Sequence, residues 1–412
     1  MRGMTQQTRA ETYWDVPAAV LISLVVQATV SLFAAGIPVL APVIAAERGW
    51  NATVIAFYPL VVYVTAFLIS FQIPGLLFRM GGMGLSLACV AIGAAGILLL
   101  LPPYAAAAAL ASVAIGFGTG AMNPASSQIL GPRTTARTAG LVMSIKQTGV
   151  PLGGVMAGAL VPMLALRSGW RAAALDLAVI GVALAIALLP SVRWLNGAAA
   201  SAKPAAFRPL DPVRYLRAIP GMPTLLLASV TFNGMQLCLR SFFTVYLVTN
   251  QHFSLVTAGM AFSVSQAAGM AGQVGWAALS DRWLSVHAVM AIIGAIMTTA
   301  AFCTAAMTPH WPLGGIALVA AMYGVSAAGY LPVLLGEVVR RSPPGQVGAL
   351  TSGAQLFPLG GSILGPLAFG GMAAVAGMPA AFVMAAASTL AGTAILAAPH
   401  RLFALPYQGY KR

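Results

Sequence analysis

Long apolar segments alternate with short polar ones along almost the whole chain. Most of the apolar segments are close to the roughly 20 residues that an α-helix needs to cross a bilayer. The polar positions between them are few and gather in short turns. The pattern predicts twelve membrane-spanning helices, at residues 16–45, 53–73, 83–101, 105–129, 139–164, 172–189, 223–248, 255–279, 287–308, 313–336, 346–370 and 379–398.

One longer hydrophilic stretch, residues 191–222, interrupts this pattern near the middle of the chain. Its alanine, proline, lysine and arginine content is typical of a linker. A short interfacial helix is expected within it, around Pro212–Ala218. The linker divides the chain into an N-terminal half, residues 1–190, and a C-terminal half, residues 223–412, each with six predicted spans.

Composition agrees with a membrane protein and excludes a soluble one. Hydrophobic residues make up 59% of the 412 and charged residues 7%, whereas soluble domains hold about 25% charged residues. The net charge of +14 comes from basic residues scattered through the turns. With the N-terminus in the cytoplasm, all of the basic residues in turns fall inside except Arg48, Arg167 and Arg171. We therefore expect both termini in the cytoplasm, a cell inner-membrane location and no nucleic-acid partner.

Enzyme chemistry has no support in the sequence. The four histidines lie at span ends or in turns without metal-ligand spacing. No glycine-rich phosphate loop ending in Lys-Ser/Thr is present, so nothing indicates ATP hydrolysis. We expect no enzymatic activity, no cofactor and no metal site.

The two halves repeat one another. The sequence PLGG at residues 151–154 returns at 358–361, 207 positions later. The pair Gly116 and Pro124 matches Gly324 and Pro332, 208 positions later. Parallel six-helix repeats are a known transporter architecture with a central site between the halves. The sequence thus predicts an all-α membrane protein of twelve transmembrane helices in two pseudo-symmetric six-helix bundles.

Two charged turns carry a family resemblance. AALSDRW ends a span of the second half and contains Asp281 and Arg282, and PGLLFRM in the first half contains Gly75 and Arg79. With the repeat, these segments resemble the major facilitator superfamily of secondary transporters over essentially the whole chain. In that family a Gly-x-x-x-Asp-Arg motif in each half braces neighbouring helices in one conformation. The resemblance implies a gating role for these four residues and a monomer, although the first half lacks the aspartate.

The fifth predicted span contains TGVPLGG, similar to a glycine–proline motif of antiporters in the same family. We place Gly149, Pro151, Gly153 and Gly154 among the gating candidates. Small residues four apart let helices approach closely, and a proline permits a bend. Tight packing without exchange is the simpler interpretation of this segment.

Two cations fall inside predicted spans, Lys146 in the fifth and Arg240 in the seventh. A charged side chain at the bilayer centre costs about 2.5 kcal/mol or more and normally has a partner or a function. Asn233 and Gln236 share one predicted helix face with Arg240. No acidic residue lies at mid-span to neutralise the two cations. An anionic substrate bound by both is therefore expected.

Further polar and aromatic side chains are candidates for the walls of the substrate cavity. They lie in spans that border the cavity in the family, and for each one helix packing is an equal alternative. These residues are Asn123, Gln147, Gln266, Tyr330, Gln355 and Tyr58, with Gln355 near the repeat-equivalent of Lys146.

The sequence favours a secondary transporter for a small organic anion, such as a carboxylate, working by alternating access. A proton-antiport exporter of drug-like compounds or metabolites is the alternative, and a membrane sensor or assembly factor without transport is a third. Burial disfavours a charged lysine, so Lys146 is also a candidate proton carrier for symport. Uniport or anion exchange with a permanently charged lysine stays equally open.

Overall fold

The computed structural model describes residues 15–49, 52–135, 137–196 and 210–397, and within them the regular elements are all helical. The first half contains the helices α1 (Asp15–Arg48), α2 (Ala52–Ser70), α3 (Ile73–Leu98), α4 (Ala105–Leu130), the 3₁₀ turn η1 (Gly131–Arg133), α5 (Ala139–Gln147), α6 (Gly149–Leu188) and α7 (Ser191–Asn196). The second half contains α8 (Asp211–Ala218), α9 (Met222–Thr249), α10 (Leu255–Arg282), α11 (Val286–Ala305), α12 (Leu313–Ala327), α13 (Tyr330–Arg341) and α14 (Val347–Leu396). The short helix α8 lies where the sequence predicts one.

Eight helical stretches among the described residues are long and apolar enough to cross a membrane. Three helices change direction at a glycine with positive φ: Gly81 in α3, Gly169 in α6 and Gly377 in α14. Glycine adopts this conformation without the steric cost that a side chain brings. Each of these glycines lies in a gap that the sequence pattern predicts between two spans.

Prolines explain two breaks inside predicted single spans. Pro151 has no N–H to bond the carbonyl of Gln147, the residue at which α5 ends. Pro332 likewise has no N–H to bond the carbonyl of Ala328, and α12 ends one residue before Ala328. The predicted fifth and tenth spans are therefore each built from two helices, α5 with the start of α6, and α12 with α13.

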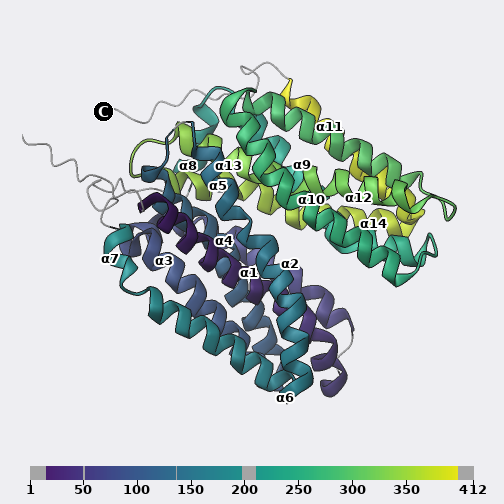
Figure 1. Ribbon diagram of the computed structural model, residues 1–412, viewed down its shortest axis with the longest axis horizontal. Helices are drawn as coiled ribbons and strands as arrows, with labels where there is room; N and C mark the ends of the chain where they lie inside the picture. The colour runs from purple at the N-terminus through teal and green to yellow at the C-terminus, as the bar shows by residue number, and fades with distance from the viewer. Residues whose placement is uncertain (1–14, 50–51, 136, 197–209, 398–412) are drawn as a thin grey trace, which may run out of the picture.

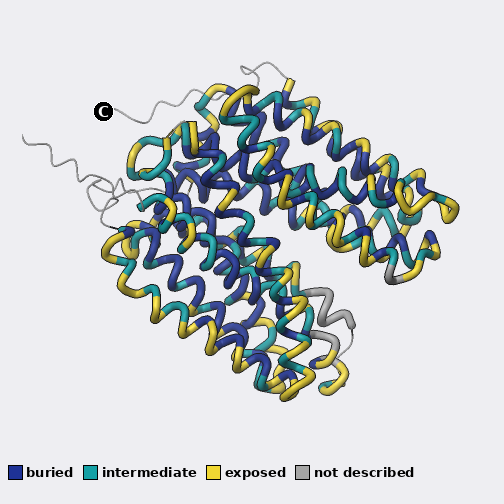
Figure 2. Tube along the Cα trace, in the orientation of Figure 1, coloured by how far each residue is buried: buried dark blue, intermediate teal, exposed yellow. Residues whose placement is uncertain are grey.

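The helices of the two halves gather on different sides of the molecule (Figure 1). One buried core contains only residues from Val26 to Ala178, and another only residues from Leu216 to Leu396. Figure 2 shows buried positions running along the inner sides of both groups. A third, smaller core joins the halves, with Leu335 and Val347 packing among residues of the first half.

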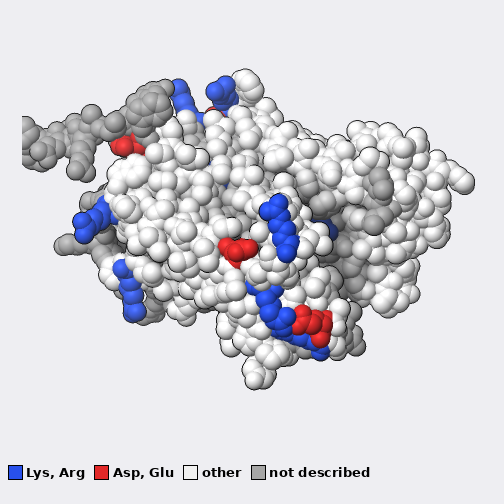
Figure 3. Space-filling model, turned by 60° about the horizontal axis from the view of Figure 1, so that its bottom comes forward, with Lys and Arg blue, Asp and Glu red and all other residues white. Residues whose placement is uncertain are grey.

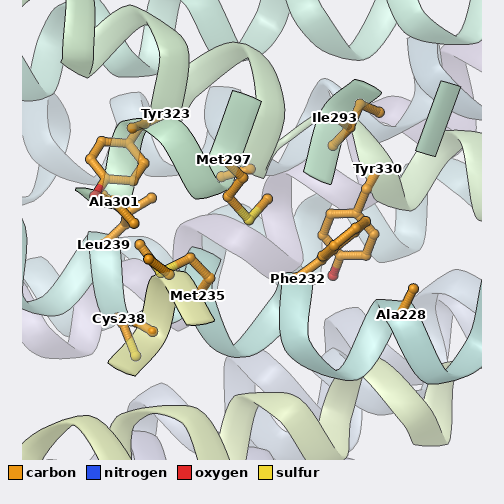
Figure 4. Close-up of a cluster of buried hydrophobic side chains, with 14 of the residues drawn as sticks. Ala228, Phe232, Met235, Cys238, Leu239, Ile293, Met297, Ala301, Tyr323 and Tyr330 are labelled. Atoms are coloured by element: carbon orange, nitrogen blue, oxygen red, sulfur yellow. The ribbon is translucent and has the colours of Figure 1, made fainter. Parts of the chain in front are cut away.

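The core of the second half is rich in aromatic and sulfur-containing side chains (Figure 4). Phe232 of α9 contacts Tyr330 of α13 edge-to-face, with ring centroids 5.9 Å apart. Phe243 of α9 meets Tyr323 of α12 in the same manner at 5.4 Å. Such pairs stabilise beyond their buried area, and they fix α9 against the broken α12–α13 pair.

The halves meet closely where α5 and α13 lie side by side (Figure 1). A Cβ on Gly336 of α13 would lie 2.7 Å from the Cα of Gly140 in α5, and a Cβ on Gly140 would lie 2.5 Å from the Asp281 carboxylate, so both positions favour glycine. We call the region formed by α5, α13, the last turn of α10 and the start of α14 the closed end. Of the basic residues that the sequence assigns to the cytoplasm, Arg282, Arg340 and Arg341 lie in these elements, and Arg133 lies in η1, shortly before α5.

Candidate functional site

A pocket lies between helices of the second half. The residues that line it come from α9, α10 and α12: Gln236, Leu239, Arg240, Phe243, Phe262, Ser265, Gln266, Tyr323, Gly324, Ala327 and Ala328. Arg240 is the one lining residue with a formal charge. The pocket thus joins one cation to three uncharged polar side chains and a largely aromatic wall.

Arg240 is exposed, although it lies in the middle of an apolar helix. Gln236 precedes it by one turn on the same face of α9, as the sequence predicts. No hydrogen bond or ion pair joins the Arg240 guanidinium to the part of the chain that the structure describes. Its charge acts on the hydroxyls of Tyr63 in the first half and Tyr330 in the second. Arg240 therefore lies near residues of both halves, with its five donors available.

Lys146 has the opposite surroundings, because its side chain is fully buried. The ammonium Nζ donates to the amide oxygens of Asn123 at 2.6 Å, Gln147 at 3.0 Å and Gln27 at 3.3 Å. An ammonium has three protons, and here each has a neutral carboxamide acceptor. We call Gln27, Asn123 and Gln147 the amide cage of Lys146. It ties α1, α4 and α5 together.

The expectation that Lys146 and Arg240 bind one anion together is not met in this conformation. Lys146 has no exposed surface and does not line the pocket, and its cage residues Asn123 and Gln147 are occupied by the lysine. Sequence analysis missed Gln27, 119 positions away. The signal was present, since Gln27 is the one side-chain amide in a mostly apolar span.

Two other predicted site residues, Asn233 and Tyr330, form hydrogen bonds between helices and do not line the pocket. The Asn233 amide donates to the Pro358 carbonyl at 2.6 Å and to the hydroxyl of Ser362. The buried Tyr330 hydroxyl donates to the Asn233 Oδ1 at 2.5 Å. This network connects α9, α13 and α14 and leaves Asn233 committed to protein contacts. Of the predicted stripe on α9, Gln236 and Arg240 reach the pocket and Asn233 does not.

Gln355 and Tyr58 also contact backbone. The Gln355 side chain of α14 donates to the carbonyl oxygens of Gly120 at 3.1 Å and Thr119 at 3.4 Å in α4, and so joins the two halves. Pro124 explains why the Gly120 carbonyl is available, because it lacks the N–H that would bond it within the helix. Tyr58 donates to the Ala34 carbonyl at 2.8 Å. Gln266 is the remaining predicted wall residue that lines the pocket.

Asp281 lies at the closed end, in the last turn of α10. Its carboxylate accepts the backbone N–H of Leu141 at 2.8 Å and of Gly140 at 3.3 Å, the first turn of α5. A carboxylate at a helix N-terminus satisfies free N–H groups and complements the helix dipole. Arg340 of α13 donates to the same carboxylate at 2.7 Å. One side chain of the second half thus caps a helix of the first.

The ionic contacts continue along α13. Arg340 and Arg341 both bond Glu337, each at 2.9 Å. Sequence analysis assigned Arg340 and Arg341 to topology alone and did not connect them with Asp281. Their signal was the sequence GEVVRR, in which an acid precedes two arginines by three and four positions, a spacing that forms ion pairs on a helix.

Three of the expected gating residues have no such contacts. Arg282 is exposed, and the partner of Asp281 is Arg340 instead. Gly75 and Arg79 are exposed on the first turns of α3, and a Cβ on Gly75 would meet no atom within 4 Å. The gating role expected of Asp281 and Arg282 stays a prediction. Of the two, Asp281 makes the contacts with α5 and α13, because successive residues of a helix point in different directions.

A further bond between the halves lies beside this network. The Gln128 amide of α4 accepts the backbone N–H of Gly348 at 2.8 Å and donates to the Gly345 carbonyl at 3.3 Å. Both partners lie at the start of α14 or just before it. Nothing in the sequence around Gln128 distinguishes it from other glutamines in spans.

The glycines of the fifth span serve close packing. A Cβ on Gly149 or Gly153 would lie within 3 Å of the backbone of α1, whereas one on Gly154 would meet nothing. Pro151, buried, sets the break between α5 and α6. In the second half, Gly361 packs on the backbone of α9. Gly153 and Gly361, 208 positions apart, thus make the same kind of close contact with a neighbouring helix in the two halves.

The opposite end of the first half carries its own charged group. Glu47 accepts hydrogen bonds from the Trp170 indole at 2.6 Å and from Arg171, whose guanidinium lies over the indole ring at 4.6 Å from its centroid. The bond from Arg171 holds the pKa of Glu47 below its usual value, with the Trp170 bond adding to the effect. On the face in Figure 3, most of the surface is uncharged and charged side chains are few. That distribution suits a surface covered by lipid.

No group of histidine, cysteine, aspartate and glutamate in the described ranges could hold a metal ion. A search of curated protein sequences found no match.

Solved structures show the same fold at low sequence identity. A bacterial homologue of the iron transporter ferroportin, in an outward-facing state, matches with a TM-score of 0.72 and 16% identity, covering 93% of this chain and 98% of that one. The human organic anion transporter MFSD10 matches with a TM-score of 0.63 and 17% identity, covering 93% and 99%. The E. coli fucose:proton symporter matches with a TM-score of 0.67 and 14% identity, covering 93% and 98%.

The family model of the Major Facilitator Superfamily matches residues 23–331, about three quarters of the chain. That range includes α2 to α12, and with them Lys146, Arg240 and the pocket. The chain belongs to the Major Facilitator Superfamily of membrane transporters.

Proposed function

We propose that this protein is a secondary transporter of a small organic anion and that Arg240 binds the anionic group. One observation carries the proposal: an exposed arginine lies in an apolar span, in a pocket whose described lining holds no acid. A guanidinium binds a carboxylate through two parallel hydrogen bonds. Gln236 and Gln266 supply further donors beside it.

The architecture that we propose has twelve spans in two six-helix bundles. The three glycine turns split α3, α6 and α14, and the fifth and tenth spans combine two helices each. The domains are then residues 1–190 and 223–412, joined by the linker 191–222. The distribution of arginines supports a cytoplasmic closed end, cytoplasmic termini and an inner-membrane location.

The contacts between the halves support a mechanism of alternating access. Asp281, Gln128 and Gln355 all bond across the halves, the first two at the closed end. We propose that this conformation is open to the outside and that these bonds break when the protein opens inward. Asp281 is the central gating residue in this account, because it caps α5 and pairs with Arg340 at once.

Uptake into proteoliposomes tests the proposal. The purified protein, reconstituted as a monomer, should accumulate or exchange labelled organic carboxylates, and Arg240→Gln should abolish this while the protein stays folded. Export of drug-like cations or neutral compounds in exchange for protons, without carboxylate transport, would establish the antiporter alternative instead. Absence of all transport alongside binding to a partner protein would favour the sensor or assembly factor.

Lys146 supports a proposal on coupling. Its three acceptors are neutral, and no carboxylate bonds it within the described ranges, so loss of its proton would leave no buried anion behind. We propose that Lys146 carries the proton of an anion–proton symporter. Lys146→Arg keeps the charge at every accessible pH. This variant should lose accumulation driven by a pH gradient and retain counterflow exchange. Persistent gradient-driven accumulation in this variant would show that Lys146 is not the proton carrier.

A further inference from the structure

The composition of the pocket limits the charge of what it can bind. Resting on the proposed anion transport, we infer that the substrate is a monocarboxylate with an apolar body, held by the second half of the protein alone. The inference rests on one observation: the exposed guanidinium of Arg240 lies beside aromatic side chains in a pocket formed by α9, α10 and α12.

The first argument is the number of cations. Arg240 is the single charged group in the described lining of the pocket. The other mid-span cation, Lys146, is fully buried and bonds three amide oxygens. A second carboxylate in the pocket would give up its hydration without an opposite charge to replace it, which is strongly unfavourable. The pocket therefore selects one negative charge.

The second argument is the polar groups beside Arg240. The side-chain amides of Gln236 and Gln266 have no hydrogen bond to any residue that the structure describes, and both line the pocket. Ser265 donates its hydroxyl proton to the Phe262 carbonyl at 2.7 Å and so can only accept from a ligand. These two side-chain amides and the N–H donors of the Arg240 guanidinium are enough to satisfy the lone pairs of one carboxylate.

The third argument is the remaining wall. Leu239, Phe243, Phe262 and Tyr323 present apolar surface, and the edge-to-face pair of Phe243 with Tyr323 holds two of these rings in place. Burying an apolar body there is favourable. A short hydrophilic acid such as acetate would leave this surface without a contact. The substrate should thus join an apolar, ring-sized or branched group to its single carboxylate.

Three matched pairs of acids test the inference by binding to the purified protein. The monocarboxylates are benzoate, 3-phenylpropionate and 4-methylpentanoate. Their partners add a second carboxylate to the same skeleton: terephthalate, 3-(4-carboxyphenyl)propionate and 2-methylglutarate. Thermal stabilisation and displacement of labelled 3-phenylpropionate measure affinity. Acetate is the control, a carboxylate without a sizeable apolar group. We expect at least tenfold tighter binding of a monocarboxylate than of its partner and of acetate.

The outcomes separate this inference from the proposed function. Equal or tighter binding of the dicarboxylates overturns the monoanion inference and leaves anion transport intact. Equal binding of acetate overturns the apolar body. Binding of none of the seven acids removes the proposed function, and the inference with it.

Substitution of one apolar residue that lines the pocket provides a second test. Phe262→Ala should weaken 3-phenylpropionate binding at least fivefold and leave carboxylate-only binding of acetate unchanged. Met260→Ala is the matched control, because Met260 is exposed on the same helix and does not line the pocket. Unliganded unfolding temperatures of both variants check that they fold. Unchanged binding of 3-phenylpropionate to a folded Phe262→Ala would overturn the assignment of the wall.

Discussion

The surroundings of Lys146 and Arg240 differ, although both are cations inside apolar helices. Lys146 has no exposed surface and three amide partners from α1, α4 and α5. Arg240 is exposed, and its guanidinium makes no hydrogen bond to the described part of the chain. A buried charge needs partners, and the first half supplies them from the protein. We propose that the substrate supplies them in the second half.

This difference assigns separate tasks to the two halves. The first half keeps its cation within a helix-joining network, which suits a group that responds to protonation or conformation. The second half holds the pocket, its aromatic wall and the arginine. Sequence symmetry between the halves therefore does not extend to the chemistry of their interiors.

The largest expected effect comes from removing the arginine. Arg240→Gln should weaken anion binding by about 2–5 kcal/mol, the typical loss when one partner of a bonded charge pair is truncated. Arg240→Lys should restore little of the lost affinity, since lysine lacks the planar guanidinium that binds a carboxylate through two parallel hydrogen bonds. Equilibrium binding of a labelled carboxylate measures both. Arg167→Gln is the control, an exposed arginine outside the pocket. Unchanged affinity in Arg240→Gln would mean that the substrate binds elsewhere.

The second largest effect is expected at Asp281, the proposed gating residue. Asp281→Asn removes the charge that bonds Arg340 and caps α5, and should destabilise the closed end by about 1.5–3 kcal/mol. We expect slower turnover and, for a cysteine introduced into the closed end, greater labelling by a thiol reagent, with nearly unchanged affinity at the pocket. Arg282→Gln should behave as the wild type, because Arg282 is exposed. A defect in affinity alone, with no change in labelling, would contradict gating by Asp281.

The cage of Lys146 should affect stability more than binding. Asn123→Leu removes the acceptor at 2.6 Å and leaves a buried ammonium proton unsatisfied, at a cost of about 1–3 kcal/mol in the free energy of unfolding. Gln266→Leu is the matched control, an amide that bonds no described residue, and should change stability by less than about 0.5 kcal/mol. Equal unfolding temperatures for Asn123→Leu and wild type would show that the cage contributes nothing.

The smallest effect is expected at Gln355. Gln355→Leu removes its bonds to Gly120 and Thr119, neutral contacts worth about 0.5–1.5 kcal/mol together. Its Oε1 is buried without a hydrogen-bond partner among described residues, and removing this atom offsets part of the loss. Transport rates should change less than about threefold. A complete loss of transport would place Gln355 at the substrate instead.

Local features of the sequence predicted much of the fold. The gaps between apolar segments contain the glycine turns at Gly81, Gly169 and Gly377, because a turn between helices needs a residue that tolerates positive φ. The shared face of Gln236 and Arg240 follows from helix periodicity and needs no tertiary information.

Contacts between distant segments could not be predicted in this way. The apolar pattern gives the depth of Lys146 but not which helices surround it, so Gln27 and the closed cage were missed. Asp281 was identified by its motif, yet its partner Arg340 lies 59 positions away on another helix. Pairing across helices depends on packing, which a single sequence does not contain.

A structure of the purified protein with bound 3-(4-bromophenyl)propionate tests the central claim most directly. The bromine can be located by its anomalous scattering, and it marks the apolar end of the ligand. We predict the carboxylate on the Arg240 guanidinium and the bromine beside Phe243 and Phe262, with Lys146 still inside its amide cage. A ligand bonded to Lys146, or bound away from α9, would contradict the account.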